Sequence, residues 1–344
     1  MPNTEDRETK KIQPNELTSE QKTSIKTRTL VAIPLVATFL VALIFGGWVM
    51  MAFIALLAGF GIYEIIKSAK KKFQPWVWVL TYIFGYVLIF WPLIDNNVQN
   101  AMAAKEAGTT FVFQLEDSFA QLNVPITIIG LCLMIYFLTG ILDEKLNFKD
   151  IAHLFAFTFL VALGLQAMLV CRFFPFVAYG VYSSIDTNAY GFKWAWSAGL
   201  LFVVYAVCSL TDVFAYFGGM LFGKHKMNPR ISPKKTWEGF FIGWAFGAAI
   251  GMGIMFLMAG LNYPVIPALD MDHWWGIVIL GILMPLIGTL GDLAFSLIKR
   301  SEEIKDFSNL LPGHGGILDR FDSPIFASLG TAIIISFFVQ GWVL

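Results

Sequence analysis

Charged residues and cysteines are scarce in this chain. Asp, Glu, Lys and Arg make up 14% of its 344 residues, against about a quarter in an ordinary soluble domain. The three cysteines, Cys132, Cys171 and Cys208, lie in or beside apolar runs without CxxC spacing. This pattern argues against a disulfide framework, so we expect reduced packing residues. The formal net charge is zero, which gives no sign of a nucleic-acid partner, and we expect none.

Hydrophobic residues make up 57% of the chain and gather in long runs. A bilayer core requires roughly 20 apolar residues per helix. The first two runs are divided at Gly46 and Gly47, because paired glycines suit a tight reversal. We predict an all-α, polytopic bundle of about nine transmembrane helices, near residues 30–47, 48–66, 74–94, 124–142, 151–171, 195–222, 238–260, 276–298 and 324–343.

Basic residues are concentrated in alternate segments. Residues 1–29 are polar and too long for a signal-peptide n-region, so we expect a flexible cytoplasmic tail before a retained helix. With the N-terminus inside, only Lys105, Arg172 and Lys193 of the 24 Lys and Arg residues lie outside, as the positive-inside rule requires. The inside loops are then 67–72, 143–150, 223–237 and 299–323, and the outside loops near 95–123 and 172–194 are expected to be surface caps.

Four glycines recur every four residues in the run 238–260, at positions 239, 243, 247 and 251. This spacing places them on one slowly drifting stripe of a helix. A stripe of small residues permits close contact between membrane helices, so we predict a packing role for it.

An acidic residue lies inside the eighth run. Helical spacing places Asp292, Ser296 and Lys299 on one face toward the cytoplasmic end. A charge near the bilayer centre costs roughly 2.5 to 3.5 kcal/mol on insertion scales, which favours a functional site. A simple ion pair between Asp292 and a basic residue is the structural alternative.

The stretch from Lys305 to Asp322 combines charges with turn-forming residues. Pro312 and three glycines prevent a regular helix, so backbone amides can turn inward and cradle oxyanions. Arg320 adds positive charge, and Asp319 offers hard oxygen ligands of the kind that Mg²⁺ prefers. The stretch predicts a site for a metal-bound polyphosphate, with a solvated loop as the alternative.

A second polar cluster precedes the seventh run. Ser232 or Thr236 is suitably placed to cap the helix that follows, whose positive end attracts phosphate. An anchor at the lipid headgroups is the alternative. Asp212 and Tyr216, near the end of the sixth run, are expected to join the same vestibule, whereas Glu64 is expected to be a structural or interfacial partner.

This C-terminal pattern resembles the signature of the phosphatidate cytidylyltransferase family, also called CDP-diglyceride synthases. The segment from Ser232 to Gly239 is similar to the family's middle motif. The resemblance covers about residues 200–344, whereas the first half is similar only in being hydrophobic. The elements of the signature are Ser296, Lys299-Arg300, Lys305-Asp306, Pro312, His314-Gly315-Gly316 and Asp319-Arg320-Phe321-Asp322.

The resemblance implies that CTP and phosphatidate react to give CDP-diacylglycerol and pyrophosphate, with Mg²⁺ required. Our hypothesis is that Asp292 and Asp319 hold one or two ions. We divide the chain into a flexible cytoplasmic tail (1–29), N-terminal transmembrane helices with two outer loops (30–194) and a catalytic transmembrane region (195–344). Phosphates would be clamped by Lys299, Arg300, Lys305 and Arg320, and groups oriented by Asp306, His314 and Asp322. Substrate contacts would come from Ser296, Gly315, Gly316, Asp212, Tyr216, Ser232, Lys234, Lys235, Thr236 and Glu238.

Two rival functions stay open at this point. A CTP-dependent polyprenol or phytol kinase also pairs a nucleotide with a lipid, and a secondary transporter would use Asp292 and Asp212 as ion sites. We expect CTP, phosphatidate and membrane lipid as partners, with a homodimer as an open alternative. The expected location is a bacterial plasma membrane, with the site facing the cytoplasm.

Overall fold

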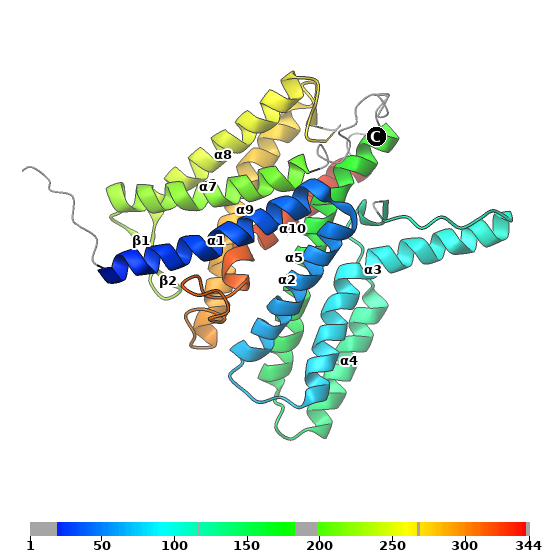
Figure 1. The fold of residues 1–344 in the computed structure, drawn as a ribbon, viewed down its shortest axis with the longest axis horizontal. Coiled ribbons are helices and arrows are strands. Elements are labelled where there is room, and N and C mark those ends of the chain that lie inside the picture. Colours follow the sequence, from blue (N-terminus) through cyan, green and yellow to red (C-terminus); the bar gives the residue numbers. More distant parts are fainter. Residues whose placement is uncertain (1–18, 116, 183–197, 267–268, 342–344) are drawn as a thin grey trace, which may run out of the picture.

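The computed structural model describes residues 19–115, 117–182, 198–266 and 269–341 (Figure 1). Helices dominate this part of the chain, and a small hairpin, β1 (Lys226–Asn228) and β2 (Ser232–Thr236), is the one departure from the predicted all-α class among the described residues. The helices are α1 (Ser19–Phe45), α2 (Gly47–Ser68), α3 (Pro75–Ala107), α4 (Ile126–Leu142), α5 (Phe148–Tyr182), α7 (Gly199–Phe222), α8 (Trp237–Gly260), α9 (Trp274–Ser301) and α10 (Leu318–Gly341), with a short 3-10 turn η1 (Asp117–Phe119).

Each predicted apolar run overlaps one helix over most of its described residues. Six helices, α2, α3, α5, α7, α8 and α9, contain segments long and apolar enough to cross a membrane, and two shorter apolar helices cover 30–45 and 126–142. The ninth run lies in α10. The chain is therefore a polytopic helical membrane protein, while the count of nine spans stays a prediction.

The reversal between the first two runs lies where the paired glycines predict it. Gly46 and Gly47 have φ values of 56° and 46°, which disfavour residues with a side chain. The fully buried Arg172 fills the inside of this turn, and its Nε donates to the carbonyl of Leu43 at 2.8 Å. A Cβ on Gly46 would approach the Arg172 guanidinium to 2.3 Å. The chain therefore turns here because glycine alone fits.

Several predicted boundaries were wrong. Helix α1 begins at Ser19 inside the predicted flexible tail, and α3 continues to Ala107 into the predicted outer loop. Arg172 does not lie in an outer loop, because α5 runs through it to Tyr182. In α3 and α5 polar side chains bind backbone carbonyls: Asn97 Nδ2 donates to the Gln114 carbonyl at 2.8 Å, and Arg172 Nε to that of Leu43. Residues 183–194 of the other predicted loop lie outside the described part.

Helices α5 and α10 lie at the centre of the bundle. Helix α10 packs against α9, α5 and α7, while α5 also contacts α2, α3 and α4. In Figure 1 the helices α7, α8 and α9 form one group and α2 to α5 another, with α10 between them. Contacts on α5 therefore connect the last helix to the N-terminal half of the chain.

The predicted glycine stripe is confirmed as a packing surface against α7. A Cβ on Gly243 would lie 2.6 Å from the Thr211 carbonyl oxygen, and one on Gly239 would lie 2.6 Å from that of Ala215. The atoms in the way belong to backbone, which cannot move without separating the helices. The stripe thus sets how closely α8 approaches α7, the helix that bears Asp212.

We expect Gly243→Ala to destabilise the protein, because overpacking of a close contact costs typically 1 to 3 kcal/mol. Gly253→Ala is the matched control on the same helix, since its Cβ would meet nothing within 4 Å. Thermal unfolding in detergent measures both. Equal midpoints for the two variants would contradict the packing role of the stripe.

The predicted inside loops meet at one end of the bundle. Lys70 Nζ donates to the Glu303 carbonyl at 3.1 Å, and Lys71 forms an ion pair with Asp150. Arg300 Nε donates to the carbonyl of Ile231 at 3.3 Å. These contacts join all four loops. Successive transmembrane helices run in opposite directions, so every second loop lies on the same side of the membrane, as predicted for these basic loops.

Candidate active site

The loop between α9 and α10 folds around the carboxylate of Asp319. Its Oδ1 accepts from Lys299 Nζ at 2.8 Å, and its Oδ2 accepts from the amides of Phe307 at 2.9 Å and Gly316 at 2.8 Å. The Asp319 side chain is 2% exposed and that of Lys299 is 11% exposed. One buried carboxylate therefore ties the end of α9 and both ends of the loop together.

A tight turn forms the tip of this loop. Leu311 and Gly315 face each other as a bridge, with the Leu311 amide donating to the Gly315 carbonyl at 2.9 Å. Gly313 and Gly315 have φ values of 76° and 82°, where other residues are strained. The glycines are therefore required by backbone geometry, and they return the chain so that Gly316 reaches Asp319.

A second carboxylate reaches this loop from the N-terminal half. Glu64 on α2 is fully buried and accepts from the amides of Ile317 and Leu318, both at 2.8 Å, and from Ser308 Oγ at 2.6 Å. A Cβ on Gly316 would lie 2.5 Å from Glu64 Oε1. The expected structural role of Glu64 is confirmed, although its partners were not predicted from the sequence.

The inward-turned amides of the loop therefore have protein partners. We predicted amides that cradle oxyanions, and those of Phe307, Gly316, Ile317 and Leu318 do so. Their oxyanions are the carboxylates of Asp319 and Glu64 rather than substrate phosphates. These four amides are therefore already engaged by the protein's own carboxylates.

Three further carboxylates interact electrostatically near the loop: Asp212 on α7, Asp292 on α9 and Asp322 on α10. We call these the carboxylate cluster. Asp292 forms an ion pair with Lys235 of β2 rather than with Lys299, and it accepts weakly from Ser296 Oγ at 3.4 Å. Positive charge from Lys235, Lys299 and Arg320 acts on the cluster. The predicted charged residues of three helices are thus brought together.

The hairpin before α8 is closed by residues of the predicted middle motif. Thr236 is the N-cap of α8, and its Oγ1 accepts from the Gly239 amide at 3.2 Å. Glu238 accepts from the amides of Lys224 and His225 at 3.1 and 3.2 Å. Of the two predicted caps, Thr236 is confirmed, whereas Ser232 lies in β2 opposite Asn228. Glu238 shapes the hairpin that presents Lys235 to Asp292.

Some predicted site residues have no contact with the cluster in the described part of the chain. Tyr216 is 68% exposed, and its ring packs on Phe217. Lys234, Lys305 and Asp306 are exposed. His314 is half-buried, and its Nδ1 has no hydrogen-bond partner within the described residues. Tyr216 lies on α7, Lys234 on the hairpin, and Lys305, Asp306 and His314 on the loop between α9 and α10.

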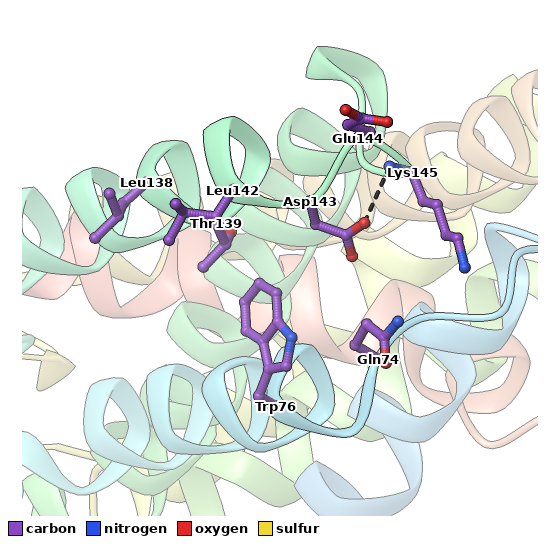
Figure 2. A pocket seen from close by; sticks show the side chains of 8 residues that line it. All are labelled: Gln74, Trp76, Leu138, Thr139, Leu142, Asp143, Glu144 and Lys145. Atoms are coloured by element: carbon purple, nitrogen blue, oxygen red, sulfur yellow. Dashed lines mark hydrogen bonds between the residues drawn. The ribbon is translucent and has the colours of Figure 1, made fainter.

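A separate hollow of about 570 Å³ lies between the start of α3 and the end of α4 (Figure 2). Trp76 and Leu142 line it together with the turn at Asp143, whose Oδ1 accepts from the Lys145 amide at 3.0 Å. None of the predicted site residues lines this hollow. It is therefore distinct from the carboxylate cluster.

No group of three or more His, Cys, Asp and Glu residues in the described ranges is arranged to hold a metal ion. Mg²⁺ in phosphate-handling sites commonly takes one or two carboxylates and completes its shell with substrate phosphates and water. Asp292 is one-quarter exposed and suits this use. Asp319 has one acceptor position of Oδ1 available for a metal ion, because Lys299 and two backbone amides occupy the other positions of its carboxylate.

Comparison with known proteins identifies the family of this chain. A model described as the cytidylyltransferase family matches residues 26–338. The chain belongs to this family. It is similar to proteins named phosphatidate cytidylyltransferase from Staphylococcus saprophyticus, with 29% identity over 304 residues, and Staphylococcus epidermidis, with 30% over 310; each alignment covers 88% of this chain and 95% of the relative. The relative of that name in Staphylococcus aureus is 30% identical over 305 residues.

Membership in the cytidylyltransferase family makes the chain a nucleotidyltransferase and extends the resemblance beyond the C-terminal half. The matched region includes α2, and therefore Glu64, as well as the carboxylate cluster. Sequence reasoning missed Glu64 as a site residue because its partners lie about 250 positions away. A single acidic residue within an apolar run was the available signal.

Proposed function

We propose that this protein transfers the cytidylyl group of CTP to phosphatidate, giving CDP-diacylglycerol and pyrophosphate for phospholipid biosynthesis. The observation that supports this most strongly is the pair of ion pairs Lys235–Asp292 and Lys299–Asp319, which bring lysines and carboxylates of the hairpin, α9 and α10 to one end of a membrane bundle. Such a site can hold several phosphate groups beside a lipid. The names of the relatives agree with this substrate pair.

The chemistry requires alignment and charge neutralisation rather than a protein nucleophile. A phosphate oxygen of phosphatidate attacks the α-phosphorus of CTP in line, and a P–O bond forms. The bond between the α-phosphorus and the bridging oxygen to the β-phosphate breaks, and its electron pair leaves with pyrophosphate. Lys299, Arg300, Lys305 and Arg320 would neutralise the repelling anions and orient them.

Mg²⁺ is proposed to be held by Asp292 and Asp319, with substrate phosphates completing its coordination. When bound, it supplies positive charge to phosphate oxygens. Asp306, His314 and Asp322 are proposed to orient ligands by hydrogen bonds, and Ser296, Gly315 and Tyr216 to lie along the substrate path. The unpaired Nδ1 of His314 supports such a use.

The site is proposed to face the cytoplasm of a bacterial plasma membrane. The four predicted inside loops meet at this end, and most basic residues lie in them. Phosphatidate would keep its acyl chains in the bilayer while its headgroup enters from the side. A homodimer stays a prediction.

The test uses purified full-length protein, phosphatidate, Mg²⁺ and CTP labelled at the α-phosphate. We expect label in the lipid product, whereas a kinase that transfers the γ-phosphate would leave the lipid unlabelled. In membrane vesicles, CTP should be used only when the cytoplasmic side faces the reagent. Solute movement without CTP consumption would favour a transporter and overturn the proposal.

A further inference from the structure

Glu64 is a buried anion that binds the loop leading to Asp319 from outside the C-terminal region. Its Oε1 accepts from Ser308 Oγ and the Ile317 amide, and its Oε2 accepts from the Leu318 amide. These two amides open α10, where the first amides of any helix lack intrahelical partners. A carboxylate from α2 therefore caps α10, with the favourable sign for a helix N-terminus.

Adjacent amides of the loop are divided between two carboxylates. The Gly316 amide donates to Asp319, and the Ile317 amide donates to Glu64. If Glu64 released Ile317 and Leu318, the backbone at Gly316 would lose its fixed direction. The position of Asp319 and its partner Lys299 therefore depends on a residue of α2.

We infer that Glu64 is a positioning residue for the transfer reaction, which fixes the start of α10 and thereby holds Asp319 and Lys299 in place. This inference rests on the proposed function for its catalytic consequence. The hydrogen bonds that carry it are independent of the substrate. Through Glu64, the N-terminal half of the chain takes part in building the site.

Only a carboxylate satisfies all three donors. In Glu64→Gln, one oxygen is replaced by an NH₂ group, which faces either the Leu318 amide or the Ile317 and Ser308 donors. A donor facing a buried donor leaves both without a partner. Side-chain volume is nearly unchanged, so the variant separates hydrogen bonding from packing.

We expect Glu64→Gln to lower kcat by about 100-fold, the loss expected when reacting groups are displaced by about 1 Å. Amide hydrogen exchange should become faster in peptides covering residues 305–318, while peptides of α7 and α8 keep wild-type protection. Wild-type kcat, or unchanged exchange in the loop, would overturn the inference.

Gln166→Met is the matched control, because Gln166 is also fully buried in the N-terminal half and also binds backbone, through Leu88 and Asn123. It has no contact with the loop. We therefore expect Gln166→Met to lower the stability of the protein, as Glu64→Gln does, while kcat and amide exchange in the loop stay as in the wild type. If kcat fell as far as in Glu64→Gln, the loss of any buried hydrogen-bonding side chain would have this effect, and the inference would fail.

Two further variants keep the inference testable if Glu64→Gln does not fold. Ser308→Ala removes one of the three hydrogen bonds and should lower kcat about fivefold, as expected for about 1 kcal/mol. Gly316→Ala places a Cβ against the Glu64 carboxylate from the other side, and should increase exchange in the same peptides. Unchanged loop exchange in both variants would overturn the inference.

The two proposals fail separately in this design. If wild-type protein does not label lipid from α-labelled CTP, the proposed function is wrong, while the exchange measurements still test whether Glu64 holds the loop. If wild-type protein is active and Glu64→Gln is equally active, the proposed function stands and the positioning role is wrong.

Discussion

Asp319→Asn is expected to abolish measurable transfer and to loosen the loop before α10. The buried carboxylate accepts from Lys299 and from two backbone amides. Asparagine has one acceptor oxygen, so its NH₂ group must face either the ammonium or the amides. Breaking a buried ion pair by removing one partner costs about 3 to 5 kcal/mol of stability, so we expect a lower unfolding midpoint together with the loss of transfer. Thermal unfolding and initial rates with saturating CTP and Mg²⁺ measure the two effects.

A double variant separates the contribution of the Lys299–Asp319 pair to stability from the contribution of these two side chains to the reaction. In Asp319→Asn with Lys299→Met the uncompensated ammonium is gone, and the asparagine oxygen can accept from the Phe307 and Gly316 amides. We expect its thermal stability to recover toward the wild type while activity stays lost. Substantial Mg²⁺-dependent activity in the Asp319→Asn variant would refute the assignment.

Asp292→Asn is expected to abolish turnover with little change in stability. Asp292 is one-quarter exposed and pairs with Lys235, and it interacts electrostatically with the carboxyl groups of Asp212 and Asp322. Asparagine at 292 relieves the crowding of acidic groups, which offsets part of the lost ion pair. The function that is lost is the proposed binding of Mg²⁺ and phosphate. Transfer rates over a Mg²⁺ titration, together with thermal unfolding, provide the measurement.

Asp270→Asn is the matched control for Asp292→Asn. Asp270 Oδ1 also contacts a basic side chain, His273 Nδ1 at 2.8 Å, but it lies before the start of α9, whereas the loop that holds Asp319 follows the end of α9. We expect wild-type rates and wild-type Mg²⁺ dependence from it. Full activity in Asp292→Asn at any Mg²⁺ concentration would exclude this residue as a ligand.

Much of the candidate site was predictable because its residues lie close together in the chain. Between Ser296 and Asp322, helical spacing and turn-forming glycines place charges near one another whatever the rest of the fold does. The capping role of Thr236 was predictable for the same reason, since N-caps bind amides two or three residues on. Which cation pairs with Asp292 was not predictable, because Lys235 and Lys299 are equally suitable by charge.

Sequence patterns alone predicted the membrane class, the positions of the apolar runs, the reversal at Gly46 and Gly47, and the glycine stripe on α8. Bilayer thickness and side-chain volume act on short segments, so these features follow from local pattern. The burial of Arg172 in the first turn and the capping of α10 by Glu64 follow instead from how the helices pack. Such contacts join residues more than a hundred positions apart, and a buried charge takes whichever donors or acceptors the packed helices bring to it.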